Sequence, residues 1–248
     1  MKVSIITISF NSESTIEDTI RSVLAQEYTE IEYIIVDGGS SDGTQRIVER
    51  YIDRIAQFIS EPDKGIYDGM NKGLALATGD LIGILNSDDV YADNTVISDV
   101  VSCIRKSDAE GLYADLDYVD RNDLTKVTRR WRPGPYRHGA FRKGWMPPHP
   151  TFFVKTEIYD RYGHFSTDLT SASDYELMLR FVHKHCIRIV YLPRVVIKMR
   201  TGGHSNVTLM NRIRANREDK RAWAMNGLRP GILTLVRKPL SKIMQFVN

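Results

Sequence analysis

Cysteine is scarce in this sequence of 248 residues, in which Cys103 and Cys186 are present without a C-x-x-C spacing. The sequence therefore indicates neither a disulfide framework nor a thiolate zinc site. Long apolar runs are missing too, since no stretch approaches the roughly 18 uncharged residues that a membrane span needs. The N-terminal run MKVSIITISFN lacks the cleavage site of a signal peptide. Together these absences predict a cytoplasmic protein.

Several recognition motifs are also absent. The sequence has no G-x-G-x-x-G after its first predicted strand and no G-x-x-x-x-G-K-[ST], so neither a dinucleotide fingerprint nor a P-loop is present. It has no zinc-finger spacing and no aromatic RNP pattern, and no motif therefore supports a nucleic-acid partner. Its 42% hydrophobic and 26% charged residues are typical of a soluble globular protein. The length suits one large α/β domain or a domain with an appendage.

Charge is unevenly placed although the net charge is only +3. Residues 201–248 carry nine Lys and Arg against two acids, and residues 121–143 carry eight against one. Such clusters attract polyanions or anionic lipid head groups, whereas a solvated helix face is the simpler interpretation. After Pro230, apolar residues alternate with basic ones in the pattern of an amphipathic helix on an anionic membrane surface. Packing of this segment on the core or on a second subunit is the alternative.

The hydrophobic periodicity predicts alternating strands and helices over the first 105 residues. The strands are expected at 3–9, 31–36, 56–60 and 81–85, and the helices at 14–26, around 47–52, at 65–77 and at 93–105. Repeated units of this kind predict a mostly parallel sheet with helices on both faces. In the second half, strands are expected at 111–119, 126–131, 151–154, 188–192 and 195–199, with helices at 156–162 and 173–185 and a helical, basic remainder.

Polar side chains follow three of the predicted strands. Ser9 and Asn11 follow the first strand, Asp37 ends the second, and residues 86–89 follow the fourth. The carboxyl ends of parallel strands form the ligand crevice of an open sheet. The aspartate pair at 88–89 suits a hard divalent cation whose remaining ligands are water and phosphate oxygens of the bound ligand. The alternative is that Asp88 only caps the helix that follows. Asp37 can accept a hydrogen bond from a base imide or a ribose hydroxyl.

Four motifs in this order closely resemble the inverting family 2 glycosyltransferases of GT-A fold. They are VSIITISFN at 3–11, IIVDGGSSDGT at 34–44, EPDKGIYDGMNKG at 61–73 and TGDLIGILNSDD at 78–89. Residues 148–153 and 173–180 resemble the acceptor-side motifs of the subgroup that builds bacterial surface polysaccharides.

The resemblance implies an α/β fold of the Rossmann-like GT-A type, with a mostly parallel sheet flanked by helices, a smaller acceptor-side region and a basic helical C-terminal tail. We divide the chain accordingly. Residues 1–105 form the nucleotide-sugar-binding half of one domain, residues 106–204 form its acceptor-binding and catalytic-base half, and residues 205–248 form the tail.

The resemblance also implies residue roles for the donor. Asp37 binds the nucleobase, and Phe10 and Asn11 line the same pocket. Asp88 and Asp89 hold Mn²⁺ or Mg²⁺ on the diphosphate and touch the ribose. The motif departs from the family pattern because its first position is Asn86, which leaves open which aspartate is the metal ligand. The N-x-D register favours Asp88.

A helix resembles the family segment beside the diphosphate and donor sugar, and it carries Asp68, Asn71 and Lys72. Asp68 and Lys72 can also form a simple exposed pair four residues apart. His204, in a glycine-rich loop, is a candidate for a loop that closes over the diphosphate as a further metal ligand or donor.

On the acceptor side the resemblance makes Asp174 the catalytic base. The family commonly has Glu-Asp where this chain has Ser173-Asp174, so Asp174 acts without an acidic neighbour. The alternative is that the Asp174 charge only complements the helix dipole at the N-terminus of its helix. His149 either lies near the acceptor or is structural.

These expectations describe a metal-dependent inverting glycosyltransferase in the biosynthesis of O-antigen, capsule or exopolysaccharide. It would move a hexose or N-acetylhexosamine from a nucleoside diphosphate sugar, with UDP favoured, to a glycan or lipid-linked oligosaccharide. It would be cytoplasmic or peripheral at the inner face of the plasma membrane. A nucleotidyltransferase and a non-catalytic module that binds polyanions or polysaccharides are the alternatives.

Overall fold

One mixed β-sheet forms the centre of the molecule. A computed structural model of the chain describes residues 1–202, 209–231 and 234. The strands follow the order β3-β2-β1-β4-β8-β6-β9-β5, and β7 pairs with β6. The strands are β1 (Val3–Ser9), β2 (Ile31–Asp37), β3 (Gln57–Ser60), β4 (Leu81–Asn86), β5 (Val90–Tyr91), β6 (Gly111–Val119), β7 (Val127–Trp131), β8 (Phe153–Lys155) and β9 (Ile189–Arg200).

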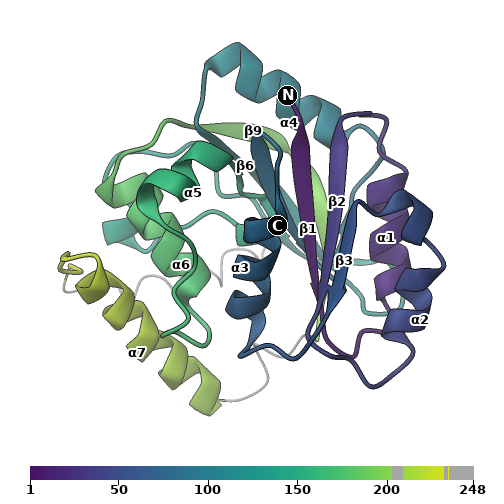
Figure 1. Ribbon diagram of the computed structural model, residues 1–248. Coiled ribbons are helices and arrows are strands. Elements are labelled where there is room, and N and C mark those ends of the chain that lie inside the picture. The colour runs from purple at the N-terminus through teal and green to yellow at the C-terminus, as the bar shows by residue number, and fades with distance from the viewer. Residues whose placement is uncertain (203–208, 232–233, 235–248) are drawn as a thin grey trace.

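The main helices cover both faces of the sheet (Figure 1). They are α1 (Ile16–Leu24), α2 (Thr44–Glu49), α3 (Ile66–Leu76), α4 (Val96–Ser107), α5 (Thr156–Tyr162), α6 (Ser173–Met178) and α7 (Leu209–Met225). Short helical turns lie at η1 (Ile52–Arg54), η2 (Ala140–Lys143), η3 (His149–Thr151) and η4 (Leu179–Lys184), the last being π-helical.

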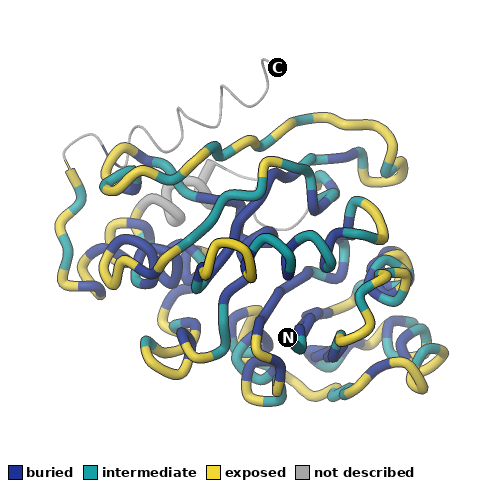
Figure 2. The backbone as a smooth tube through the Cα atoms, turned by 90° about the horizontal axis from the view of Figure 1, so that it is seen from above, coloured by how far each residue is buried: buried dark blue, intermediate teal, exposed yellow. Residues whose placement is uncertain are grey.

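Alternation along the strands divides the core in two. Ile6 and Ile8 of β1 belong to a buried cluster with side chains of α3, α5 and α6. Val3 and Ile5 point to the other face, where the buried cluster includes side chains of α1 and α4. Successive side chains of a strand point to opposite faces of the sheet, so a strand covered on both faces buries both sets of side chains. Figure 2 shows the resulting dark-blue core beneath an exposed rim of loops.

The N-terminal strands agree with the expected pattern. β1 pairs in parallel with both β2 and β4, and β2 pairs in parallel with β3. The second half is less parallel than expected, because β8 runs antiparallel to β4 and β6, while β6 and β9 are parallel. The sheet is therefore mixed.

Two elements of the second half differ from the sequence expectation. Residues 188–199 were expected to form two strands, but β9 is continuous, and its register against β6 shifts between Leu192 and Val195. The shift accommodates Pro193, a residue that ladders tolerate at bulges. The helix expected at 173–185 is α6 followed directly by the π-helical η4.

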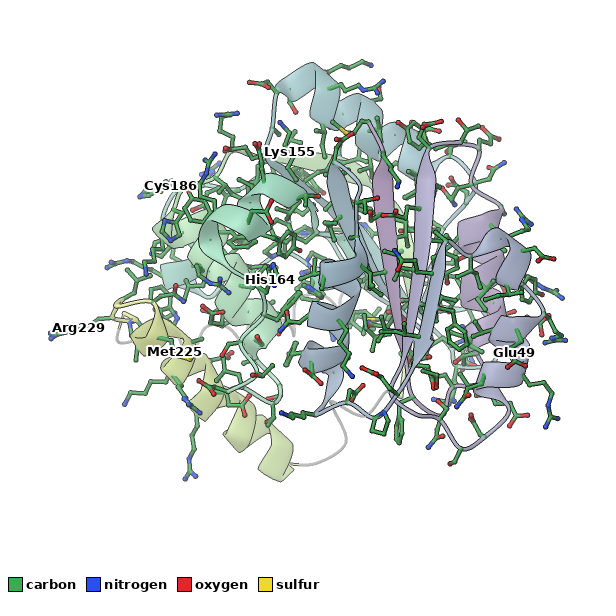
Figure 3. All side chains as sticks on the ribbon, viewed as in Figure 1. Glu49, Lys155, His164, Cys186, Met225 and Arg229 are labelled. Carbon is green, nitrogen blue, oxygen red and sulfur yellow. The ribbon has the colours of Figure 1, made fainter. Side chains whose placement is uncertain are left out.

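The C-terminal helix α7 packs against α6. The Trp223 side chain is fully buried, and its indole N–H donates to the Tyr175 hydroxyl over 2.9 Å. The Asn226 amide donates to the Glu176 carboxylate over 3.0 Å. Met225 and Arg229 mark the end of this helical region that points away from the sheet (Figure 3). The basic amphipathic segment expected after Pro230 lies outside the described residues except at 231 and 234.

Among the residues described, no helix combines the length and the apolar character that a bilayer crossing demands.

A buried carboxylate joins β2 to β1 and to the turn before β4, at the amino-terminal edge of the parallel sheet. Glu32 accepts hydrogen bonds of 2.6 Å from the Lys2 ammonium and the Ser4 hydroxyl, and of 2.7 Å and 2.6 Å from the backbone N–H and hydroxyl of Thr78. Burial acts to raise the pKa of Glu32, but these hydrogen bonds outweigh it and lower the pKa to about 2.

We expect Glu32→Gln to lower the free energy of unfolding at pH 7 by about 3 kcal/mol, because the pKa falls from 4.5 to about 2 and each pKa unit corresponds to about 1.36 kcal/mol. Because the folded-state pKa of Glu32 is depressed, this stabilisation is complete above the unfolded value of about 4.5 and is lost as the pH falls toward 2. Urea titrations of both proteins at pH 7, 4 and 3 measure the effect. A difference that stays constant with pH contradicts the ionic account.

Candidate functional site

The carboxyl ends of β1, β2 and β4 meet at one edge of the sheet, as the sequence predicted. Ser9 at the end of β1 is in register with Asp37 at the end of β2. On the other side of β1, Ile8 is in register with Asn86 at the end of β4. The polar residues that follow these strands therefore share one edge of the sheet, the place where open α/β sheets bind their ligands, and we call this edge the crevice.

Asp37 is fully buried and its carboxylate is surrounded by hydrogen-bond donors. Oδ1 accepts from the hydroxyls of Ser9 at 3.0 Å and Ser40 at 2.5 Å. Oδ2 accepts from the Ser40 backbone N–H at 2.8 Å and the Ser60 hydroxyl at 2.7 Å. These four bonds fill the usual accepting capacity of a carboxylate. Asp37 thus fixes the loop after β2 to the ends of β1 and β3.

Phe10 and Asn11 form the mouth of this crevice. The Phe10 ring is 63% exposed, which is unusual for a large apolar side chain. Asn11 has a left-handed φ of 48°, a conformation that asparagine tolerates better than most residues. Its side-chain oxygen accepts the Ser41 backbone N–H over 2.9 Å. The turn at Asn11 therefore leaves the Phe10 ring facing solvent.

The two aspartates after β4 have different surroundings. Asp89 is fully buried and accepts hydrogen bonds from the Asn86 amide at 3.0 Å and the Arg200 backbone N–H at 3.3 Å. Burial, and then the charge of Asp88, raise the pKa of Asp89 well above its usual range. Asp88 is only partly buried. The structure therefore gives Asp88 access to solvent and makes Asp89 part of the framework of the turn.

Arg200 supports this turn and was missed by sequence reasoning. Its side chain is nearly buried at the end of β9, and one guanidinium nitrogen donates to the Asp88 carbonyl over 2.9 Å. Another pairs with the Asp18 carboxylate of α1 at 2.5 Å. Asp88 and Arg200 are 112 residues apart in sequence, so no local pattern indicates the contact. Arg200 ties the aspartate turn to β9 and α1.

Metal binding depends on which ligands the turn can present. The described part of the chain contains no convergent group of three or more His, Cys, Asp or Glu side chains. One partly exposed carboxylate at a strand end suits Mg²⁺ or Mn²⁺ whose other ligands are water and phosphate oxygens. Asp88 fits that description. His204, the further candidate ligand, lies outside the described residues.

Helix α3 holds the loop before it. The Asp68 carboxylate accepts the Lys64 backbone N–H over 3.0 Å. The Lys72 ammonium pairs with Glu61 at 2.8 Å and donates to the Pro62 carbonyl over 3.0 Å. The Lys72 ammonium lies 3.9 Å from the Asp68 carboxylate, so the ion pair expected from their spacing is present but long. Both residues therefore shape the 61–65 loop.

Asn71 of α3 makes a different connection. Its amide donates to the Phe165 carbonyl at 2.9 Å and accepts the Phe165 backbone N–H at 3.0 Å. Phe165 follows His164, which Figure 3 labels on the segment beside α3. This two-way bond fixes the segment that leads from α5 to α6.

Asp174 lies at the start of α6 among residues from three elements. The Tyr67 hydroxyl of α3 donates to Asp174 Oδ1 over 3.2 Å. Burial, and then the charge of Asp174, raise the pKa of Tyr67. The Tyr67 ring stacks on Phe165 at 5.8 Å, and the His149 ring meets Phe165 edge-on at 5.6 Å. Tyr67 was not expected from the sequence.

His149 is buried within this group. Burial lowers the pKa of His149, and the charge of Asp174 opposes the shift without reversing it. The imidazole is therefore favoured in its neutral form. The structure thus places His149 close enough to Asp174 for the carboxylate charge to act on the imidazole, and the acceptor-side roles of both residues stay predictions.

Comparison with known proteins identifies the family. The model of glycosyl transferase family 2 matches residues 4–163, which is more than half of the chain. The chain therefore belongs to glycosyl transferase family 2 and is a glycosyltransferase, as the motif resemblance predicted.

Two curated relatives extend this comparison. An uncharacterized glycosyltransferase of Mycobacterium tuberculosis is 34% identical over 180 residues, covering 72% of this chain and 68% of the relative. The UDP-Glc:alpha-D-GlcNAc-diphosphoundecaprenol beta-1,3-glucosyltransferase WfgD of Escherichia coli is 28% identical over 251 residues, covering 99% and 91%.

Solved structures share the fold. The structure of S. aureus TarS 1-349 in complex with UDP-GlcNAc has a TM-score of 0.72 at 21% identity, covering 91% of this chain and 65% of that one. Mannosyltransferase PcManGT from Pyrobaculum calidifontis in complex with GDP-Man and Mn²⁺ has a TM-score of 0.67 at 21% identity, covering 90% and 63%. This chain thus spans slightly less than two thirds of each structure.

Proposed function

We propose that this protein is a metal-dependent, inverting glycosyltransferase that transfers a sugar from a UDP-sugar to a lipid-linked oligosaccharide during synthesis of a bacterial surface polysaccharide. The observation that carries the proposal is the crevice at the ends of β1, β2 and β4, where Phe10 and Asp88 are accessible while Asp37 and Asp89 are buried. The relative WfgD, a UDP-Glc:alpha-D-GlcNAc-diphosphoundecaprenol beta-1,3-glucosyltransferase, supports the choice of substrates.

Asp174 is the proposed catalytic base. Inverting transfer needs a group that takes the proton from the acceptor hydroxyl while its oxygen attacks the anomeric carbon. Asp174 is partly exposed, and the Tyr67 hydroxyl orients one of its oxygens, which leaves the other to face an acceptor. Neutral His149 can hydrogen-bond the acceptor without adding positive charge next to this base.

Asp88 is the proposed protein ligand of Mn²⁺ or Mg²⁺, held in place by the Arg200 contact to its carbonyl. When bound, the ion neutralises charge that develops on the departing diphosphate. Asp68, Asn71 and Lys72 stay in the donor proposal as residues of α3 that hold the neighbouring loops in place.

A peripheral position at the inner face of the plasma membrane is part of the same proposal. Arg217, Lys220 and Arg221 on α7 and Arg229 after it are exposed, so their charges are available to anionic lipid head groups. A lipid-linked acceptor makes such a position useful, because it places the crevice close to the carrier.

A nucleotide panel tests the donor proposal. We expect UDP with Mn²⁺ or Mg²⁺ to raise the melting temperature more than UDP with EDTA, because a ligand of the native state stabilises it by RT ln(1 + [L]/Kd), about 2.7 kcal/mol at 100 Kd. The measurement is a thermal-shift assay with UDP, GDP, CMP and dTDP, each with metal or EDTA. Absence of a shift with every nucleotide contradicts the proposal and favours a non-catalytic binding module.

A further inference from the structure

The loop between β3 and α3 places a carboxylate directly over the ends of β1 and β2. A Cβ atom built on Gly38, just after β2, would lie 2.5 Å from Oδ2 of Asp63. A Cβ atom on Gly69 of α3 would lie 3.3 Å from the same oxygen and 3.0 Å from the Ile8 side chain of β1. Glycine at both positions therefore leaves the space that the Asp63 carboxylate occupies.

The two oxygens of Asp63 have different surroundings. Oδ1 accepts the Gly65 backbone N–H over 2.9 Å, which fixes the side-chain orientation. Oδ2 lies beside Gly38 and receives no hydrogen bond from the residues that the structure describes. Asp63 is also only partly buried, whereas the neighbouring Asp37 is enclosed and accepts four hydrogen bonds. The acceptor available at this point of the crevice is therefore Asp63.

An exposed aromatic ring follows β1 at the same edge of the sheet as this acceptor. The Gly38 backbone N–H donates to the Ser9 carbonyl over 2.8 Å, so Gly38 adjoins the residue that precedes Phe10. The Phe10 ring is 63% exposed and offers a face for base stacking. An exposed ring and an accessible carboxylate at the same strand ends can together hold a planar heterocycle, the ring by stacking and the carboxylate by accepting a hydrogen bond from the edge of the base.

We infer that Asp63 selects the base of the donor by accepting its ring imide N–H. This inference rests on the proposed function. A carboxylate accepts from the ring N–H of uracil, thymine or guanine, whereas cytosine and adenine present an unprotonated ring nitrogen there and are repelled. Asp63 therefore restricts the donor to nucleotides with an imide N–H, and Asp37 shapes the pocket without touching the base.

Asp63→Asn tests the inference in the full-length chain. Asparagine keeps one oxygen for the Gly65 N–H and turns an NH₂ group toward the base. We expect affinity for the preferred imide nucleotide among UDP, dTDP and GDP to fall by about 10–100-fold, since hydrogen bonds to charged groups are the stronger ones. Affinity for CDP should be unchanged or higher, because the amide can donate to the cytosine ring nitrogen. Equilibrium binding with Mn²⁺ measures both.

Two further variants separate base reading from folding. Gly38→Ala is expected to reduce the same preference with Asp63 intact, because the added methyl displaces Oδ2. Asp53→Asn removes an exposed carboxylate from η1, outside the crevice, and should leave the ratio of affinities unchanged. Melting curves without nucleotide confirm that each variant is folded.

The outcomes distinguish the inference from the proposed function. A wild-type preference for an imide nucleotide that survives in Asp63→Asn, or an equal weakening of all nucleotides, overturns the role of Asp63 and leaves the proposed function standing. A wild-type preference for CDP or ADP overturns the imide rule. If the wild-type protein binds none of the nucleotides, both fail.

Discussion

Asp174→Asn is expected to lower kcat by about 10²–10⁴-fold while affinity for the nucleoside diphosphate stays unchanged. Asparagine has the size of aspartate and can still accept the Tyr67 hydroxyl, but it cannot take a proton from an acceptor hydroxyl. Because Asp174 lies on α6 and not among the strand ends, donor binding should not depend on it. Transfer of a labelled sugar, measured beside a nucleotide thermal shift, separates the two effects.

The matched control is Asp168→Asn. Asp168 is exposed in the segment that precedes α6, so its substitution removes the same charge from the same region without reaching Tyr67. We expect its kcat to stay within about twofold of wild type, since surface substitutions change little. A loss below tenfold in Asp174→Asn would instead assign Asp174 to a favourable charge at the helix start.

Local periodicity was sufficient to predict most of the fold. The predicted bounds of β1, β6 and α5 match the structure at both ends, and the other predicted elements of residues 1–105 are displaced by a few residues, whereas the two-residue strand β5 was not predicted. The direction of β8 could not be predicted, because it depends on the partners β4 and β6 and not on its three residues. The continuity of β9 was missed because Pro193 signals a strand end, whereas a register shift against β6 accommodates it.

The strand-end rule predicted where the site lies but not which side chains are accessible. Asp37, Asp88 and Asp89 all stand at or just after the end of a predicted strand, so the sequence does not distinguish them. The buried carboxylates of Asp37 and Asp89 accept hydrogen bonds from distant elements, such as the Ser60 hydroxyl and the Arg200 backbone N–H. One local signal was available, because Asp37 and Ser40 have the spacing of an aspartate that bonds a nearby backbone N–H. The contact of Tyr67 with Asp174 spans 107 residues and has no such signal.

The two aspartates after β4 differ in burial, and we therefore expect their substitutions to affect kcat differently. Asp88→Asn is expected to lower kcat by at least about a hundredfold at saturating donor, because a metal at a developing phosphate charge is worth several kcal/mol. The partly exposed Asp88 is the proposed ligand of the cation on the diphosphate. Its loss should also remove the difference between UDP with Mn²⁺ and UDP with EDTA in the thermal shift.

Asp89→Asn is the informative partner of this variant. Asp89 is fully buried against the Asn86 amide and the Arg200 backbone N–H, so its substitution changes the turn and not the accessible carboxylate. We expect a smaller loss of kcat and a retained response of UDP to Mn²⁺. Both Asp89 oxygens accept hydrogen bonds, so the amide keeps its oxygen for the Arg200 N–H and turns its NH₂ group toward the Asn86 amide, which must rotate to accept it; we therefore expect a lower melting temperature without nucleotide. If Asp89→Asn removes the response to Mn²⁺ and Asp88→Asn keeps it, the metal ligand is Asp89, and the turn must open before the donor binds.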